Sequence, residues 1–130
     1  MIKLVAFDLD GTIADTIPMC IEAFKQAVSP YASKILSEDD IVKTFGPNEE
    51  GMIKEVVSED WEKALIDFYV IYKEMHTVYI QPFVGIRELI TELKENSIIV
   101  SLITGKGQRS CDITLRHFEM EAPVSYTHLR

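Results

Sequence analysis

The 130-residue sequence has few basic residues, only two cysteines and no long apolar run. Lys and Arg total 13 against 21 Asp and Glu, a formal net charge of −8, so non-specific binding to nucleic acid is not expected. No apolar run reaches the ~18 residues of a bilayer span, so no membrane helix is predicted. Cys20 and Cys111 have no paired spacing and are interpreted as free, buried thiols in a reducing compartment.

The first residues also lack the features of a secretory signal. Lys3 precedes a short apolar run that Asp8 and Asp10 end, and this run is too short for the apolar region of a signal peptide. With 47% apolar and 26% charged residues, the composition is that of a globular protein. We therefore expect a chain that begins at Met1 and works in the cytoplasm.

Two apolar runs predict strands of a parallel sheet. Residues 2–7 and 98–103 are nearly continuous in apolar side chains, as expected of strands covered on both faces. Elsewhere apolar residues recur at steps of three and four, which predicts helices. The helices are expected over 17–28, within 37–78, over about 83–96 and over about 108–118.

The segment 37–78 is predicted to contain more than one helix. Ser37 and Asp40 have the spacing of a helix-capping pair, residues 45–48 (Phe-Gly-Pro-Asn) interrupt the pattern, and Ser58 is expected to cap a longer helix. An apolar stripe at helical spacing follows, which we interpret as a packing face and not as a cofactor-binding motif. Its members are Trp61, Leu65, Phe68, Tyr72 and Met75.

These elements indicate an α/β fold, a partial doubly wound (Rossmann-like) parallel sheet core with an inserted α-helical cap. The segment 16–80 is too long for an ordinary crossover between two parallel strands, so it is assigned to the cap. Residues 1–15 and 81–130 are assigned to the core.

Polar, glycine-containing loops follow both predicted strands. Ligands of open α/β sheets bind at the carboxyl ends of the strands, so these loops are expected to form one site. A simpler interpretation is a polar turn with Asp10 as a helix cap, and Thr-Gly-Lys is a common turn on its own. A phosphate-binding P-loop is excluded because Val100 stands where that motif needs glycine. The site candidates are Asp8, Asp10, Gly11 and Thr12 after the first strand and Thr104, Gly105 and Lys106 after the second.

The two acids suggest a particular chemistry. Two carboxylates this close repel each other unless a cation or a proton lies between them, and Mg²⁺ prefers such hard oxygen ligands. One acid can then act as a nucleophile and the other as a proton donor and acceptor. Thr104 and the first amides of the following helix are candidates to bind phosphate oxygens.

The sequence from Phe7 to Thr16 (FDLDGTIADT) resembles the first motif of the haloacid dehalogenase-like hydrolases, and 103–106 (ITGK) resembles the second. Residues 82–86 (PFVGI) are similar to the segment that re-enters the core after the cap. The resemblance covers about residues 1–120 and is nearest to phosphoglycolate phosphatase-like and pyrophosphatase-like members with a helical cap.

This resemblance implies Mg²⁺-dependent hydrolysis of a small phosphate monoester. Asp8 would form a phosphoaspartate, and Asp10 would protonate the leaving oxygen and then activate water. Mg²⁺ would bind the Asp8 side chain and the Asp10 backbone carbonyl, and Thr104 would hold the phosphoryl group. Gly46 lies where such caps carry a specificity loop, although it also fits a simple helix–helix turn. Tyr69 and Tyr72 are further candidates for substrate contact in the cap.

The sequence departs from the family pattern at its C-terminal end. The downstream lysine and acidic pair of the family have no counterpart after Phe118, and residues 122–130 also lack the apolar pattern of the next strand. We therefore expect a truncated chain, with Lys106 as a candidate for part of the missing positive charge, and self-association through exposed sheet edges. A sugar-phosphate mutase of the same superfamily and a catalytically inert fragment stay open as alternatives.

Overall fold

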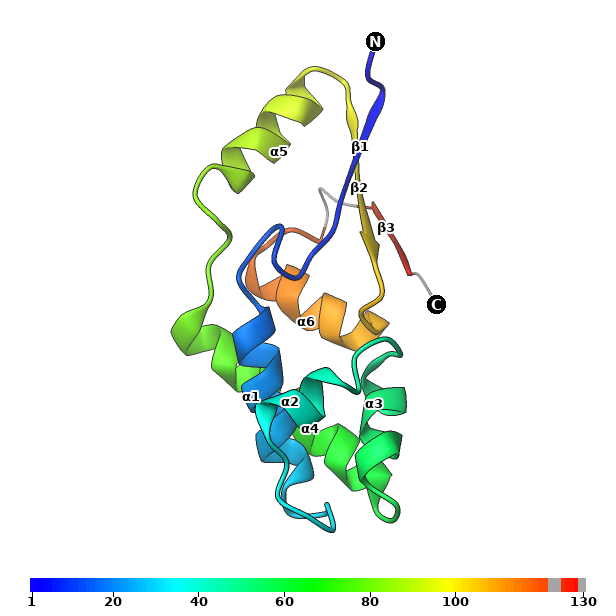
Figure 1. The fold of residues 1–130 in the computed structure, drawn as a ribbon. Helices are drawn as coiled ribbons and strands as arrows, with labels where there is room; N and C mark the ends of the chain where they lie inside the picture. The colour runs from blue at the N-terminus through cyan, green and yellow to red at the C-terminus, as the bar shows by residue number, and fades with distance from the viewer. Residues whose placement is uncertain (122–124, 129–130) are drawn as a thin grey trace.

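The computed structural model describes residues 1–121 and the backbone of 125–128. Along the described chain, a strand is followed by five helices, a second strand, a further helix and a third strand (Figure 1). The elements are β1 (Leu4–Phe7), α1 (Ile17–Val28), α2 (Glu38–Val42), α3 (Glu49–Val56), α4 (Trp61–Tyr79), α5 (Ile86–Glu95), β2 (Ile99–Thr104), α6 (Gln108–His117) and β3 (Ser125–His128).

The strands form a parallel sheet in the order β1-β2-β3. Leu4 of β1 lies opposite Ile99 of β2, and Ser101 of β2 lies opposite Ser125 of β3. The expectation that no strand follows the last helix is wrong, because Ser125–His128 pairs in parallel with β2. Backbone groups alone form these hydrogen bonds, so a short polar segment can pair at a sheet edge without an apolar pattern.

The sheet packs its helices against one face. Val100 and Leu102 of β2 are buried with residues of α5 and α6, whereas Ile99 and Ile103 are 59% and 41% exposed. The expectation of strands covered on both faces is therefore wrong for the part of the chain that the structure describes. Within the described residues, α5 and α6 cover one face of the sheet, so successive side chains of β2 alternate between buried and more exposed positions. The predicted fold class, an α/β protein with a parallel sheet, is confirmed.

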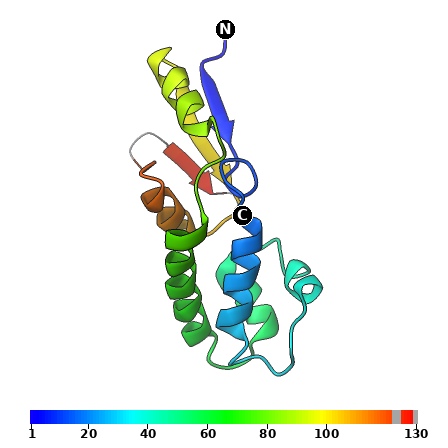
Figure 2. The same ribbon diagram turned by 90° about the vertical axis from the view of Figure 1, so that its left-hand side faces the viewer.

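The helices from α1 to α4 enclose a second group of buried side chains, separate from the one beside the sheet. Helices α1 and α4 lie side by side along most of α1 (Figure 2). Phe68 of α4 contacts Phe24 of α1 edge-on and stacks on Tyr72, with ring centroids 5.3 Å apart in the second pair. The stripe in α4 is thus a packing face, as predicted.

Two helix starts show how local sequence acts. Ser37 and Asp40 form the expected capping box, in which each side chain accepts a hydrogen bond from the other residue's backbone N–H. The expectation that Ser58 caps the long helix is wrong, because α4 begins at Trp61. Asp60 has a left-handed backbone (φ 60°), which a right-handed helix cannot contain, so the helix starts after it.

The two buried groups draw on different parts of the chain. One group contains residues between Met19 and Tyr72, and the other combines residues 9–14 with residues between Ile90 and Met120. The division into a cap at 16–80 and a core remains a prediction. Within the described residues, no helix combines the length and the apolar character that crossing a membrane requires.

Candidate functional site

A cavity of about 320 Å³ lies at the carboxyl ends of β1 and β2. The loops after the two strands form one part of its wall, and residues around the start of α3 form another. The sequence candidates that line it are Asp8, Asp10, Thr104, Gly105, Lys106 and Gly46. Gly11 and Thr12 are exposed on the turn and are not among the described residues that line the cavity.

The loop after β1 is held by its own backbone and by two buried side chains. The carbonyl of Leu9 accepts hydrogen bonds from the N–H groups of Thr12 and Ile13, at 3.2 and 2.9 Å. Leu9 and Ile13 are fully buried and anchor the loop. Gly11 has φ +79°, a conformation that favours glycine, and its N–H donates to the carbonyl of Ala14. The resulting tight turn keeps the acids on either side of Leu9 at the cavity.

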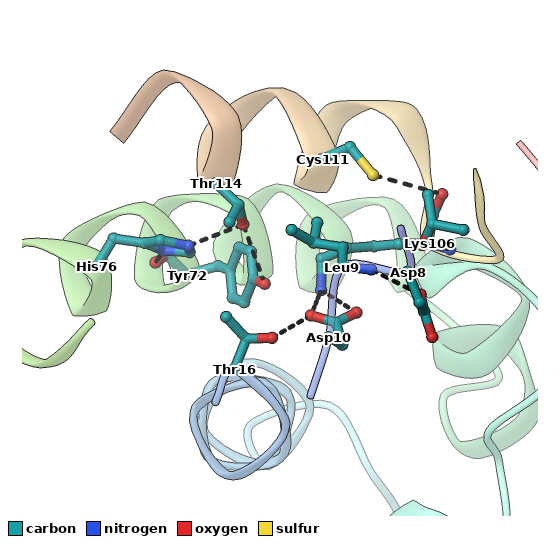
Figure 3. Close-up of polar contacts among 10 residues, drawn as sticks. Asp8, Leu9, Asp10, Thr16, Tyr72, His76, Lys106, Cys111 and Thr114 are labelled. Atoms are coloured by element: carbon teal, nitrogen blue, oxygen red, sulfur yellow. Dashed lines mark hydrogen bonds and ion pairs between the residues drawn. The ribbon is translucent and has the colours of Figure 1, made fainter. Parts of the chain in front are cut away.

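Asp10 accepts hydrogen bonds from two other parts of the chain. The hydroxyl of Thr16 donates to Oδ1, and the ammonium of Lys106 lies 3.2 Å from both carboxylate oxygens. Figure 3 shows the Lys106 side chain extending toward Asp10. The same ammonium lies 4.6 Å from the ring centroid of Tyr72, a cation–π contact. The Asp10 carboxylate therefore joins the first loop to Thr16, just before α1, and to the second loop, and Lys106 in turn contacts α4.

Lys106 is 8% exposed, and its side chain is almost completely buried. Burial by itself lowers the pKa of an ammonium, but the surrounding Tyr72, Cys20 and Asp10 outweigh this effect and hold the pKa of Lys106 well above its usual range. Lys106 is therefore a permanent cation at neutral pH. It is also the only Lys or Arg among the described residues that line the cavity.

The second loop presents both a hydroxyl and open space. Thr104 is 2% exposed, and its Oγ1 accepts a hydrogen bond from the backbone N–H of Lys106 at 3.1 Å. The hydroxyl proton of Thr104 is then available to another acceptor. A methyl group on Gly105 would meet nothing within 4 Å, so the side of the loop at this residue is open. Gly46 has φ +139°, where other residues are strained, and also borders open space.

A buried polar chain continues from Tyr72 away from the cavity (Figure 3). The Nε2 atom of His76 lies 2.9 Å from the hydroxyl of Thr114, which lies 3.4 Å from the Tyr72 hydroxyl. The Nδ1 atom of His76 lies 2.6 Å from the carbonyl of Tyr72. Burial lowers the pKa of His76, so its neutral form is favoured. These contacts fix the ring of Tyr72 beneath the Lys106 ammonium.

Several functional candidates differ from the sequence expectations. Tyr72 is fully buried and supports Lys106, and Tyr69 lines a different cavity, where Arg109 lies over its ring. The sequence reasoning did not anticipate the bond from Thr16 to Asp10. It also missed Glu49, which lines the site cavity. The signal for Glu49 was its place directly after the Phe-Gly-Pro-Asn interruption that already contained a specificity candidate.

The residues at the cavity fit a divalent cation only in part. The Asp8 carboxylate and the backbone carbonyl of Asp10 offer hard oxygens, which suit Mg²⁺. The structure describes no group of three or more His, Cys, Asp or Glu that could hold a metal ion. Mg²⁺ usually keeps several waters and needs only one or two carboxylates, so this small set of oxygen ligands is sufficient for Mg²⁺. It is insufficient for an ion whose ligands all come from the protein.

A parallel α/β sheet with an acidic pair after its first strand, facing a threonine and a lysine after the next, defines a Rossmann-like protein with a strand-end site. The family model of the haloacid dehalogenase-like hydrolases matches residues 5–127. The chain belongs to this family, and the resemblance expected from the first motif is confirmed.

Curated proteins and solved structures agree with this assignment. The chain is 23% identical over 115 residues to pyrophosphatase PpaX of Bacillus mycoides, covering 88% of this chain and 54% of that protein. It thus spans about half the length of the curated relatives it matches. A predicted phosphoglycolate phosphatase from Haemophilus somnus has a TM-score of 0.77 at 19% identity, covering 98% of this chain and 62% of that one. CbbY from Rhodobacter sphaeroides, in complex with phosphate, has a TM-score of 0.79 at 15% identity, with 97% and 64% covered. These structures share the fold.

Proposed function

We propose that the chain carries the phosphoryl-transfer site of a Mg²⁺-dependent phosphatase acting on a small phosphate monoester. The supporting observation is that Asp8, Asp10, Thr104 and Lys106 line one cavity although 98 positions separate the two outermost residues. A nucleophile, a proton acceptor, a hydroxyl donor and a fixed cation are the groups that hydrolysis of such an ester requires. In this proposal the helices of residues 16–80 form the cap.

In the first half of the reaction, a carboxylate oxygen of Asp8 attacks phosphorus and the bond from phosphorus to the leaving oxygen breaks. Asp10 gives a proton to that oxygen, so an alcohol departs and a phosphoaspartate remains. In the second half, water attacks phosphorus, Asp10 takes its proton, and phosphate leaves with Asp8 restored. The Asp10 carboxylate accepts hydrogen bonds from two donor groups, the Thr16 hydroxyl and the Lys106 ammonium, an arrangement that suits the second half directly.

The other groups bind and orient the phosphoryl group. Thr104 has a hydroxyl proton to donate to a phosphoryl oxygen, and Lys106 holds Asp10 in place while its positive charge offsets the charge of the incoming dianion. Asp8 and Asp10 would hold the Mg²⁺, which supplies positive charge that reduces repulsion between the phosphate and the attacking carboxylate.

The test is hydrolysis of an aryl phosphate by the 130-residue chain, with and without Mg²⁺. We expect metal-dependent turnover that Asp8→Asn abolishes. Asp39→Asn, the same chemical change at an exposed position on α2, is the matched control and should keep full activity. Equal turnover by Asp8→Asn and the native chain would refute the proposal, as would the absence of turnover from a folded sample.

A further inference from the structure

Glu49 is the first residue of α3 and places a carboxylate at the cavity described above. The residue is only 5% exposed, and its Oε2 atom has no hydrogen-bond partner among the residues that the structure describes. A buried polar atom without a partner destabilises the folded chain, and the effect is larger for a carboxylate than for a neutral group. The position therefore needs an explanation.

This oxygen lies beside the start of α6. Oε2 lies so close to the backbone of Gly107, which precedes α6, that a methyl group on Gly107 would collide with it. The positive end of a helix dipole favours a carboxylate there. This contact accounts for the charge of Glu49 but leaves Oε2 without a donor.

Glu49 itself lines the cavity, and the charges there indicate what kind of ligand group its carboxylate would attract. Among the described lining residues, three carboxylates face one ammonium. That ammonium, on Lys106, is already paired with Asp10. A ligand group that approaches Glu49 is therefore bound best if it donates hydrogen bonds or carries positive charge, and it is repelled if it is anionic.

We propose that Glu49 selects phosphate monoesters whose alcohol part carries an ammonium or a hydroxyl group. The inference rests on the proposed function, because it assumes that the phosphate lies at Asp8 and Thr104. It disfavours pyrophosphate, which adds negative charge and offers no donor when it is fully ionised, although the curated relatives carry the name pyrophosphatase. It disfavours phosphoglycolate for the same reason.

Three esters of equal length separate these possibilities: 2-aminoethyl phosphate, 2-hydroxyethyl phosphate and propyl phosphate. Binding to the 130-residue chain in Mg²⁺ buffer is measured by calorimetry on the Asp8→Asn variant, which prevents turnover. We expect 2-aminoethyl phosphate to bind about tenfold or more tightly than propyl phosphate, as one charge-assisted hydrogen bond would give. The hydroxyethyl ester should lie between them, and pyrophosphate and phosphoglycolate should bind more weakly than the hydroxyethyl ester.

Adding Glu49→Gln keeps the shape of the side chain and removes its charge, so the preference for the aminoethyl ester over propyl phosphate should fall to about threefold or less. Glu50→Gln is the matched control, because Glu50 is half-exposed and paired with Lys54, and it should retain the full preference. A purely structural role of Glu49 would change the melting temperature without changing the preference.

Equal affinity of the Asp8→Asn variant with native Glu49 for the aminoethyl and propyl esters overturns the inference. This result does not depend on whether the variant with Glu49→Gln folds. Absence of measurable binding by all three esters to a folded chain overturns it as well. Failure of the proposed function is a separate result, because it appears in a chain with native Glu49 as aryl phosphate turnover that survives Asp8→Asn, or as no turnover from a folded sample.

Discussion

The pair between Lys106 and Asp10 can be tested by replacing Lys106 with methionine, which keeps the buried stem and removes the ammonium. At 3.2 Å the attraction amounts to about 5 kcal/mol at an effective dielectric constant of about 20. Burying the ammonium takes back several kcal/mol of this attraction. The Asp10 side chain is 26% exposed, so water partly stabilises it after the change. We expect the free energy of unfolding to fall by about 1–3 kcal/mol, less than for a fully buried pair.

The assay is urea denaturation followed by circular dichroism, combined with a double-mutant cycle. The double variant Lys106→Met, Asp10→Asn should lose less free energy of unfolding than the two single variants combined. The difference should be at least about 1 kcal/mol. Lys63→Met is the control, because its pair with Asp60 is shorter, at 2.9 Å, yet both side chains are more than half exposed. If Lys106→Met costs no more than Lys63→Met, or if the cycle is additive, the reasoning from burial is wrong.

Four further outcomes are expected. Gly107→Ala should lower the free energy of unfolding by about 1 kcal/mol, because the end of the Glu49 side chain must move to relieve a collision, whereas Gly105→Ala, which faces open space, should leave the urea midpoint unchanged. Burial lowers the pKa of His76, so the unfolded chain takes up more protons in acid and stability should fall as the pH drops from about 7 to about 5; an unchanged pH slope in His76→Gln would contradict this. Burial raises the pKa of Cys111 to about 12, so iodoacetamide at about pH 8 should alkylate it about 10³-fold more slowly in the folded than in the unfolded chain, and equal rates would refute this. Sedimentation should show species heavier than one chain, and a clean monomer would contradict the expected association through sheet edges.

Much of the fold could be predicted because its signals are local. Helix α1 begins and ends where the apolar spacing indicates, and the helix expected over about 108–118 occupies Gln108–His117. The signal for β3 is absent from the sequence, because pairing with the β2 edge uses backbone groups and does not require an apolar pattern. The predicted start of α4 was wrong because the left-handed backbone of Asp60 depends on the preceding turn, and residue spacing does not indicate the geometry of that turn.

The candidate site could be predicted in part for a similar reason. The rule that ligands bind at the carboxyl ends of parallel strands brings Asp8, Asp10 and Thr104 to one place without any knowledge of side-chain contacts. The roles of Tyr72 and Glu49 depend on how α3 and α4 pack against the two loops. Such packing is a property of the whole structure, so the apolar spacing of α4 indicated a buried face but not the ammonium that lies over it.

The separation of β1 and β2 along the chain has a consequence for folding kinetics. Leu4 pairs with Ile99, about 95 positions later, and the intervening residues form the helices from α1 to α5. Contacts within these helices close short loops, whereas the first pairing of the sheet closes a very long one and is entropically costly. We therefore expect the helical segment to become ordered early and the strands to join late. The acidic loop and the threonine loop then meet only in the last step, so a kinetic intermediate would be rich in helix and unable to bind phosphate.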